Sequence, residues 1–250
     1  MNKNVVRWAG AGVALTAVAL LAGCAVTRIE QGRQLAKAAT PFSTHPAGAT
    51  ARLLIVGDST AVGVGATSPA TSVAGRLAAS MPRLAITNLG VNGARFSDAA
   101  EQLLHTPDPR YDVVLVMAGG NDVIFMSSEA TLRAAIERTA EQAKVLAPRV
   151  IFLPPGNAGN APFFFAPLSW LMTARSRSLH AMVSEAAMRS GASYVNLYKE
   201  KAEDPFAQEP QRMHSADGLH PSDDGYALWT QELLRQSPIA DALSGSRPGR

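Results

Sequence analysis

The chain has a single cysteine, Cys24, among its 250 residues. A disulfide within the chain needs two cysteines, and the common structural zinc sites need several, so neither can hold this fold together. Stability must therefore come from a packed hydrophobic core. The sequence also lacks a cluster of residues spaced as metal ligands, and we expect neither a metal nor another cofactor.

An excess of charge of one sign is also missing. The chain has 23 lysines and arginines against 20 acidic residues, a formal net charge of +3. Two of the positive residues, Lys3 and Arg7, lie within residues 1–23, which contain no acid, so the remainder carries about +1. Its basic residues form no run of the kind that binds nucleic acid, and we expect no nucleic-acid partner.

Only one long apolar stretch lacks charge, from Trp8 to Gly23, and it follows the two basic residues. A basic start followed by a short apolar run is typical of a secretory signal. The stretch leads into the sequence LAGC at residues 21–24, which resembles the lipobox of bacterial lipoproteins. The resemblance implies cleavage before Cys24 and a lipid on its thiol. The alternatives are an ordinary signal peptide and a retained membrane anchor.

The rest of the chain divides into three parts. Residues 26–50 show no clear period and become rich in proline and polar residues, so we predict a tether over 24–50 after a signal peptide over 1–23. A domain is expected over 51–236 and a C-terminal tail over 237–250. A lipid on Cys24 would place this domain in the cell envelope, facing the periplasm from the outer membrane in a Gram-negative cell.

Strand-like and helix-like segments alternate within the domain. We predict strands over 53–56, 84–89, 112–117, 150–153 and 193–197, and helices over 71–81, 98–104, 129–146, 176–189 and 222–234. Such alternation is typical of a parallel sheet covered by helices on both faces. The fold class predicted from the residues is therefore α/β.

Polar residues follow three of these strands at the point where each strand ends. Gly57-Asp58-Ser59 comes directly after the first, a glycine and asparagine loop at 88–94 follows the second, and Asn121 follows the third. The carboxyl ends of parallel strands meet at one edge of a sheet, where ligands bind. Glycine N–H groups and an asparagine amide there can stabilise an oxyanion, and a serine can be a nucleophile.

A base for this serine occurs near the end of the chain. Asp217 lies three residues before His220, and an acid so placed can bond one ring nitrogen and leave the other for the serine. His105 and His180 fall in helical segments. His214 lies in a polar loop and is the only rival base.

Four short segments, in this order, resemble the sequence blocks of the SGNH/GDSL hydrolase family. They are Gly57-Asp58-Ser59, Gly93, Gly119-Gly120-Asn121-Asp122 and Asp217-x-x-His220. The resemblance covers about residues 52–234. It implies a flavodoxin-like, three-layer α/β/α sandwich with a parallel sheet and hydrolysis of esters by a serine.

The resemblance also implies a role for each residue of the site. Ser59 would be the nucleophile, His220 the base, and Asp217 the acid that orients it. The oxyanion donors would be the backbone N–H groups of Ser59 and Gly93 and the side chain of Asn121. Thr60 departs from the leucine of the family motif, and Gly90 is an alternative to Gly93 as donor.

Other functions are less well supported by the sequence. There is no G-x-S-x-G motif of an α/β-hydrolase, and Gly63-x-Gly65 is followed by Ser68 where a dinucleotide-binding loop needs its third glycine. A lipoprotein that binds a ligand at the same sheet edge without catalysis remains an alternative from another class.

The substrate is left open between two classes of ester. One comprises lipid-like or acyl esters, as for an esterase, lysophospholipase or thioesterase, and the other comprises O-acetyl groups on envelope carbohydrate or peptidoglycan. Residues 162–172 are rich in aromatic side chains, and we expect them to line an acyl-chain pocket or touch the membrane, unless they start a helix packed into the core. The oligomeric state cannot be predicted.

Overall fold

The computed structural model describes residue 23 and residues 25–244. The predicted signal peptide, apart from Gly23, and the lipidation site Cys24 therefore lie outside the described residues. Within the described part of the chain, no helix combines the length and the apolar character needed to cross a membrane.

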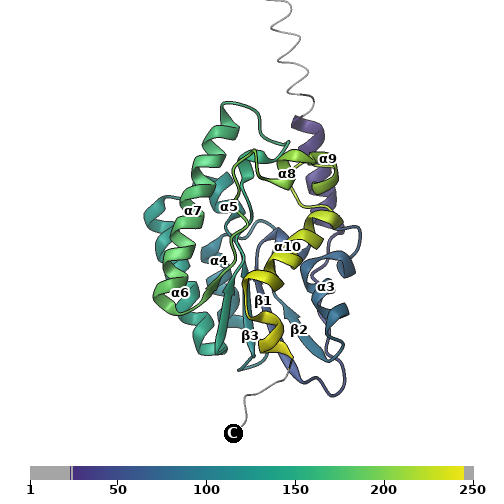
Figure 1. The fold of residues 1–250 in the computed structure, drawn as a ribbon, viewed down its shortest axis with the longest axis vertical. Coiled ribbons are helices and arrows are strands. Elements are labelled where there is room, and N and C mark those ends of the chain that lie inside the picture. The colour runs from purple at the N-terminus through teal and green to yellow at the C-terminus, as the bar shows by residue number, and fades with distance from the viewer. Residues whose placement is uncertain (1–22, 24, 245–250) are drawn as a thin grey trace, which may run out of the picture.

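The centre of the fold is a parallel sheet of five strands in the order β2-β1-β3-β4-β5 (Figure 1). The strands are β1 (Ala51–Gly57), β2 (Leu84–Asn88), β3 (Val113–Met117), β4 (Arg149–Phe152) and β5 (Ser193–Tyr194). All four pairings are parallel. This confirms the predicted α/β fold with its parallel sheet.

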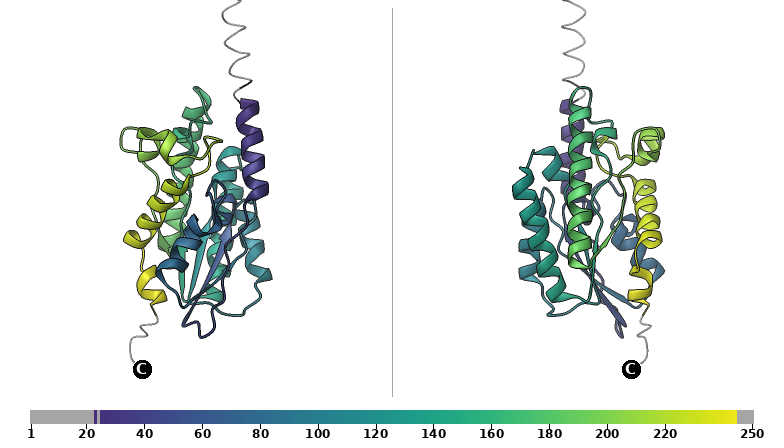
Figure 2. Two further views of the ribbon diagram at one scale, coloured as in Figure 1. Left: turned by 90° about the vertical axis from the view of Figure 1, so that its right-hand side faces the viewer. Right: turned by 60° about the vertical axis from the view of Figure 1, so that its left-hand side comes forward.

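Helices cover both faces of the sheet and complete three layers (Figure 2). One face carries α4 (Phe96–Gln102), α6 (Glu129–Leu146) and α7 (Leu168–Ser190), and the other carries α3 (Val73–Ser80), α10 (Asp223–Gln236) and α11 (Ile239–Leu243). The remaining helices, α2 (Ser59–Val62), α5 (Gly120–Ile124), α8 (Pro205–Gln208) and α9 (Pro210–Met213), are short.

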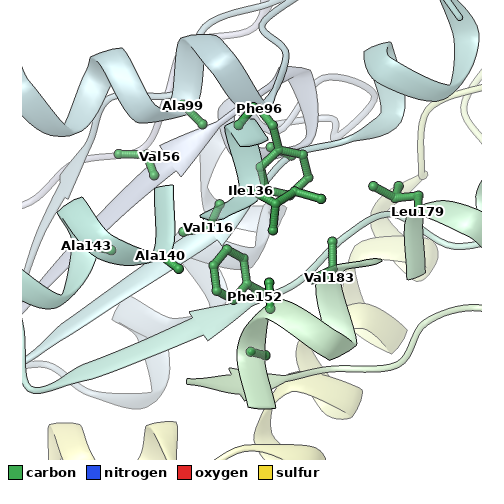
Figure 3. Close-up of a cluster of buried hydrophobic side chains, with 14 of the residues drawn as sticks. Val56, Phe96, Ala99, Val116, Ile136, Ala140, Ala143, Phe152, Leu179 and Val183 are labelled. Atoms are coloured by element: carbon green, nitrogen blue, oxygen red, sulfur yellow. The ribbon is translucent and has the colours of Figure 1, made fainter. Parts of the chain in front are cut away.

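Alternation along each central strand divides the core in two. Val56, Val116 and Phe152 belong to the cluster under α4, α6 and α7, which Figure 3 shows, whereas their neighbours Ile55 and Leu115 belong to the cluster on the opposite face. Both clusters are almost fully buried. These strands are continuous apolar runs in the sequence because neither face of the sheet is exposed to water.

The strand order creates a switch point between β1 and β3. The connection after β1 leads to β2 on one side, and the connection after β3 leads to β4 on the other side. The two connections therefore diverge between β1 and β3. Open α/β sheets bind their ligands in the crevice beside such a point. In this chain the loops that leave it begin at Asp58 and Ala118.

The predicted tether at 24–50 differs from the structure. Residues 25–38 form a helix, which we call the N-terminal helix, and Thr44 forms an antiparallel bridge to Ile86 on the edge strand β2. The half-buried face of this helix has helical spacing but only one large apolar residue; it comprises Ala25, Arg28, Gln31, Gly32, Leu35 and Ala36. The sequence therefore shows no apolar period there.

The predicted tail at 237–250 also requires a correction. Ile239 and Leu243 lie one helical turn apart in α11 and are buried against the sheet, so the domain continues to at least Leu243. Two apolar residues give too short a pattern for a helix to be predicted from sequence. Residues 245–250 lie outside the described part.

Candidate active site

Ser59 lies at the first position of α2, directly beyond β1. The strand ends because Gly57 has a φ of +141°, and a Cβ atom there would lie 1.8 Å from the Met117 carbonyl oxygen. Only glycine fits such a close approach of two strands. The turn that follows places the Ser59 side chain at the carboxyl edge of the sheet.

The buried side chain of Asp58 stabilises this turn through hydrogen bonds. Its Oδ1 accepts hydrogen bonds from the backbone N–H of Thr60 at 2.8 Å and from the Thr60 hydroxyl at 2.7 Å. Burial raises the pKa of Asp58, and the bonds from Thr60 oppose that rise. The threonine that replaces the motif's leucine thus adds a second bond to the residue that caps α2.

His220 and Asp217 approach Ser59 from the loop before α10. The distance from His220 Nε2 to Ser59 Oγ is 2.9 Å, and His220 Nδ1 lies 2.6 Å from Asp217 Oδ2. This geometry fits a neutral imidazole that donates from Nδ1 and accepts the serine hydroxyl at Nε2. The structure thus brings together the three residues predicted to form the triad, over a separation of about 160 positions.

Asp217 is almost fully buried and heavily bonded. Its Oδ1 accepts hydrogen bonds from the Ser215 hydroxyl at 2.9 Å and from the backbone N–H groups of Leu219 and His220 at 2.9 and 3.0 Å. Burial alone would raise its pKa, but the hydrogen bonds, foremost the one from His220, outweigh burial and lower the pKa to about 2. Asp217 is therefore a carboxylate at neutral pH.

Donors for an oxyanion converge on the same edge. Gly93 and Asn121 line one cavity with Ser59, and among the described residues the N–H groups of Ser59 and Gly93 have no hydrogen-bond partner. The N–H of Gly90 donates to Asn88 Oδ1 at 3.0 Å and is occupied. This geometry favours Gly93 over Gly90 as the predicted donor.

Asn121 is fixed by contacts to the neighbouring loop. Its Nδ2 donates to the Ala94 carbonyl at 2.9 Å, which leaves the second amide hydrogen for the cavity. The adjacent Asp122 accepts hydrogen bonds from the Phe96 N–H at 2.9 Å and the Ser127 hydroxyl at 2.8 Å. Asp122 therefore joins the loops that follow β2 and β3. The sequence did not predict that Asp122 is buried.

A cavity of about 610 Å³ opens beside Ser59. The predicted triad residues and oxyanion donors occupy one part of it. Large apolar side chains line the rest: Ile29, Ile124, Phe125, Phe163, Leu197, Phe206, Leu219 and Trp229. Such a cavity is of the size that holds a small organic ligand. Apart from Phe163, which lies in the aromatic segment, no motif singled out these wall residues.

His214, the rival base, also lines this cavity but does not contact Ser59. Its Nδ1 lies 3.1 Å from the Pro210 carbonyl, and its ring packs edge-on against Phe206. Burial lowers its pKa. The described residues include no group of three histidine, cysteine or acidic side chains placed to hold a metal ion.

The N-terminal helix is part of the site, which the tether prediction missed. Ile29, Arg33 and Ala36 line the cavity, and the Asn92 side chain donates to the Ala36 carbonyl at 2.8 Å. Gly32 packs so closely that an added Cβ would lie 3.2 Å from Asp217 Oδ2. This helix therefore covers both the cavity and the back of the triad acid.

Comparison with protein families and structures places the chain among known hydrolases. The model of the GDSL-like Lipase/Acylhydrolase family matches residues 55–228. A comparison with curated proteins gives no significant match.

Several solved structures share the fold. A lipase/acylhydrolase from Enterococcus faecalis is 23% identical with a TM-score of 0.59, covering 80% of this chain and 99% of its own. A member of the lipolytic G-D-S-L family from Veillonella parvula is 17% identical with a TM-score of 0.58, covering 74% and 96%. An acetylxylan esterase from Geobacillus stearothermophilus is 19% identical with a TM-score of 0.55, covering 76% and 94%.

Proposed function

The chain belongs to the GDSL-like lipase/acylhydrolase family, and from that premise we propose that it hydrolyses carboxylic esters through an acyl-enzyme on Ser59. The observation that carries the proposal is the pair of contacts from His220, at 2.9 Å to Ser59 Oγ and 2.6 Å to Asp217 Oδ2. A serine next to a base that a third group orients is the arrangement that activates this nucleophile.

Each residue then has a defined step. His220 Nε2 takes the hydroxyl proton while Ser59 Oγ attacks the ester carbonyl, and Asp217 stabilises the resulting imidazolium. The Ser59 and Gly93 N–H groups and the Asn121 amide bind the oxyanion. His220 next protonates the leaving alkoxide, and a water molecule that it deprotonates releases the acid from Ser59.

We propose lipid-like or long acyl esters as the substrate class. The support comes from the cavity beside Ser59, whose wall is mostly apolar and large enough for more than an acetyl group. An O-acetylesterase acting on carbohydrate or peptidoglycan is the second candidate. It would gain little from the aromatic wall formed by Phe163, Phe206 and Trp229.

The proposed cellular setting is the envelope. The apolar stretch Trp8–Gly23 and the LAGC sequence support a lipoprotein that is anchored through Cys24, in the outer membrane if the cell is Gram-negative. Because Cys24 immediately precedes the N-terminal helix, the anchor and the cavity would be neighbours along the chain.

A chain-length series of p-nitrophenyl esters tests the function and the substrate class together. We expect kcat/KM to rise from acetate to longer acyl esters, because each buried CH₂ group contributes about 0.8 kcal/mol. Ser59→Ala should remove turnover and labelling by a fluorophosphonate probe, whereas Ser80→Ala, a change on the surface of α3, should leave both unchanged. Turnover of the acetate ester by Ser59→Ala at the parental rate would contradict the assignment. A preference for acetate over every longer ester would favour the O-acetylesterase.

A further inference from the structure

The N-terminal helix and α7 begin at the same end of the molecule (Figures 1 and 2), and both begin with exposed apolar side chains. We call this group the apolar rim: Val26, Ile29, Phe165, Leu168, Trp170 and Leu171. Trp170 is the most exposed of them, at 71%. Large apolar side chains that are exposed together mark a site of interaction.

The two halves of the rim are in contact. The Arg28 guanidinium lies 5.5 Å from the centre of the Phe165 ring, and Arg28 also donates to the Pro162 carbonyl. The Phe163 N–H in turn donates to the Gly218 carbonyl at 2.9 Å. Arg28 therefore links the N-terminal helix to the segment that carries Phe165, and this segment is bonded to the loop that carries Asp217 and His220.

The rim also borders the entrance to the candidate active site. Ile29 belongs to the rim and lines the cavity, while the three successive phenylalanines divide their roles. Phe163 lines the cavity, Phe164 is buried in the core, and Phe165 is exposed on the rim. An apolar surface thus continues into an apolar cavity that reaches Ser59.

Phe125 and Met126 are also exposed beside the cavity, on the loop after β3, whereas other exposed apolar residues lie away from it. Val145 and Met188, both largely exposed, lie near the C-terminal ends of α6 and α7, away from the cavity entrance. Single apolar residues on a surface are ordinary. The concentration at the rim is therefore a local feature.

The chain that precedes the rim indicates what covers it. The N-terminal helix begins at the rim, directly after the uncharged apolar stretch Trp8–Gly23. If that stretch is retained, or if it is replaced by a lipid on Cys24, the group that continues the chain belongs in a bilayer. Tryptophan favours the interface between lipid and water, and the basic side chains of Arg28 and Arg33 suit its phosphates.

We propose that the apolar rim rests on a lipid bilayer and presents the cavity entrance to it. An acyl ester can then pass from the membrane into the cavity without exposing its chain to water. The role in substrate entry rests on the proposed esterase function, whereas contact with the bilayer does not.

Fluorescence of the full chain in vesicles tests the contact. The chain has tryptophans at positions 8, 170 and 229, and Trp229 is buried. In a Trp8→Phe background, vesicles of phosphatidylcholine with brominated acyl chains should quench Trp170, and the additional change Trp170→Phe should remove most of the quenching, leaving only that of Trp229 in the cavity. Equal fluorescence in brominated and ordinary vesicles would overturn the proposal.

Activity tests the consequence for substrate entry. The double variant Leu168→Ser/Leu171→Ser should hydrolyse a long-chain ester embedded in the vesicles roughly tenfold more slowly, since two apolar side chains no longer enter the lipid. Its turnover of soluble p-nitrophenyl acetate should stay within about twofold of the parent. Val145→Ser/Met188→Ser is the matched control and should retain both activities.

The outcomes separate this proposal from the esterase assignment. If Ser59→Ala retains turnover of the soluble ester, the assignment of Ser59 as the esterase nucleophile fails. The quenching of Trp170 then still decides whether the apolar rim contacts the bilayer. If the rim variant loses nothing on the embedded ester, membrane entry fails while the assignment stands. A rim variant that changes the oligomeric state, with Trp170 unquenched, would show a contact between copies of the chain and overturn the bilayer as occupant.

Discussion

At the scale of single residues, Asp217 has the most demanding position in the site. It is buried, ionised and bonded through both oxygens, and its charge holds the His220 hydrogen on Nδ1. Asp217→Asn keeps the shape but removes the charge and allows the wrong tautomer. We expect kcat for p-nitrophenyl acetate to fall by roughly 10⁴, the loss typical of this change in serine triads.

The same carboxylate makes the free energy of unfolding depend on pH. Its folded pKa of about 2 lies below the usual 3.8, so the unfolded chain binds this proton more readily than the folded protein. Its stabilising contribution is fully present above pH 3.8 and is lost as the pH falls from 3.8 to about 2. Urea denaturation across this window should show a shallower loss for Asp217→Asn than for the parent. Identical slopes would contradict the assigned pKa.

Asn121 offers a test of the oxyanion site. Asn121→Ala removes one side-chain donor and should lower kcat by roughly 10²–10³, the usual loss for one such donor. Asn121→Asp should lose more, because it places a negative charge beside the developing oxyanion. Asn196→Ala, at an exposed asparagine after β5, is the control. Unchanged kcat in Asn121→Ala, with an unchanged melting temperature, would assign the oxyanion to other groups.

The residues of the candidate triad could be predicted because each belongs to a short local pattern. Ser59 follows a strand that glycine ends, and Asp217 precedes His220 by a spacing that permits a hydrogen bond. The sequence favoured Gly93 over Gly90 as an oxyanion donor but could not decide between them. The choice depends on which N–H is already occupied, and that is a property of the folded loop.

At the scale of elements, the N-terminal helix acts on the site through packing. Gly32 leaves room for Asp217, and an alanine would require a shift of only a few tenths of an ångström. Gly32→Val should force the helix or Asp217 to move and reduce kcat on the order of tenfold, since overpacking a contact costs about 1–3 kcal/mol.

A matched change separates packing from helix propensity. Gln34→Val introduces the same β-branched side chain on the exposed side of the same helix and should leave kcat nearly unchanged. Gly32→Ala should remain within about threefold of the parent. Steady-state kinetics with p-nitrophenyl acetate measure all three variants, and equal kcat in Gly32→Val and Gln34→Val would mean that the helix does not press on Asp217.

Helices and strands with a regular pattern of apolar residues could be predicted from the sequence. Those that are stabilised mainly by contacts with other parts of the fold could not. The helix predicted over 129–146 coincides with α6, whereas α7 begins at Leu168 instead of Ser176. Its first turn belongs to the aromatic segment at 162–172, whose side chains face different surroundings and show no single apolar stripe. The N-terminal helix shows no apolar period because its half-buried face carries only one large apolar residue, Leu35.

At the scale of the whole molecule, the parallel sheet follows from the alternation of apolar strands and helices. The strand order then places the ends of β1 and β3 side by side, which is why residues far apart in sequence share one edge. The cavity walls were beyond prediction, because they combine the N-terminal helix with segments around Phe163 and Phe206 that meet only after folding.

Anchoring through Cys24 is a prediction about the molecule as a whole. Cells fed an alkyne analogue of palmitate should label the parent chain, and Cys24→Ser should lose the label entirely. The catalytic residues are unchanged, so purified Cys24→Ser should still hydrolyse p-nitrophenyl acetate at the parental rate. Labelling that persists in Cys24→Ser would place the lipid elsewhere.

The N-terminal helix limits the distance between the domain and an anchor at Cys24. A flexible linker over residues 24–50 would let the domain explore roughly 30 Å around its attachment point. The helix over residues 25–38 instead spans about 21 Å and is bonded to the domain through Arg28 and Ala36. A lipid on Cys24 would therefore hold the domain close to the membrane with little freedom to move. Ser59 would then reach only esters in the part of the membrane directly beside the domain.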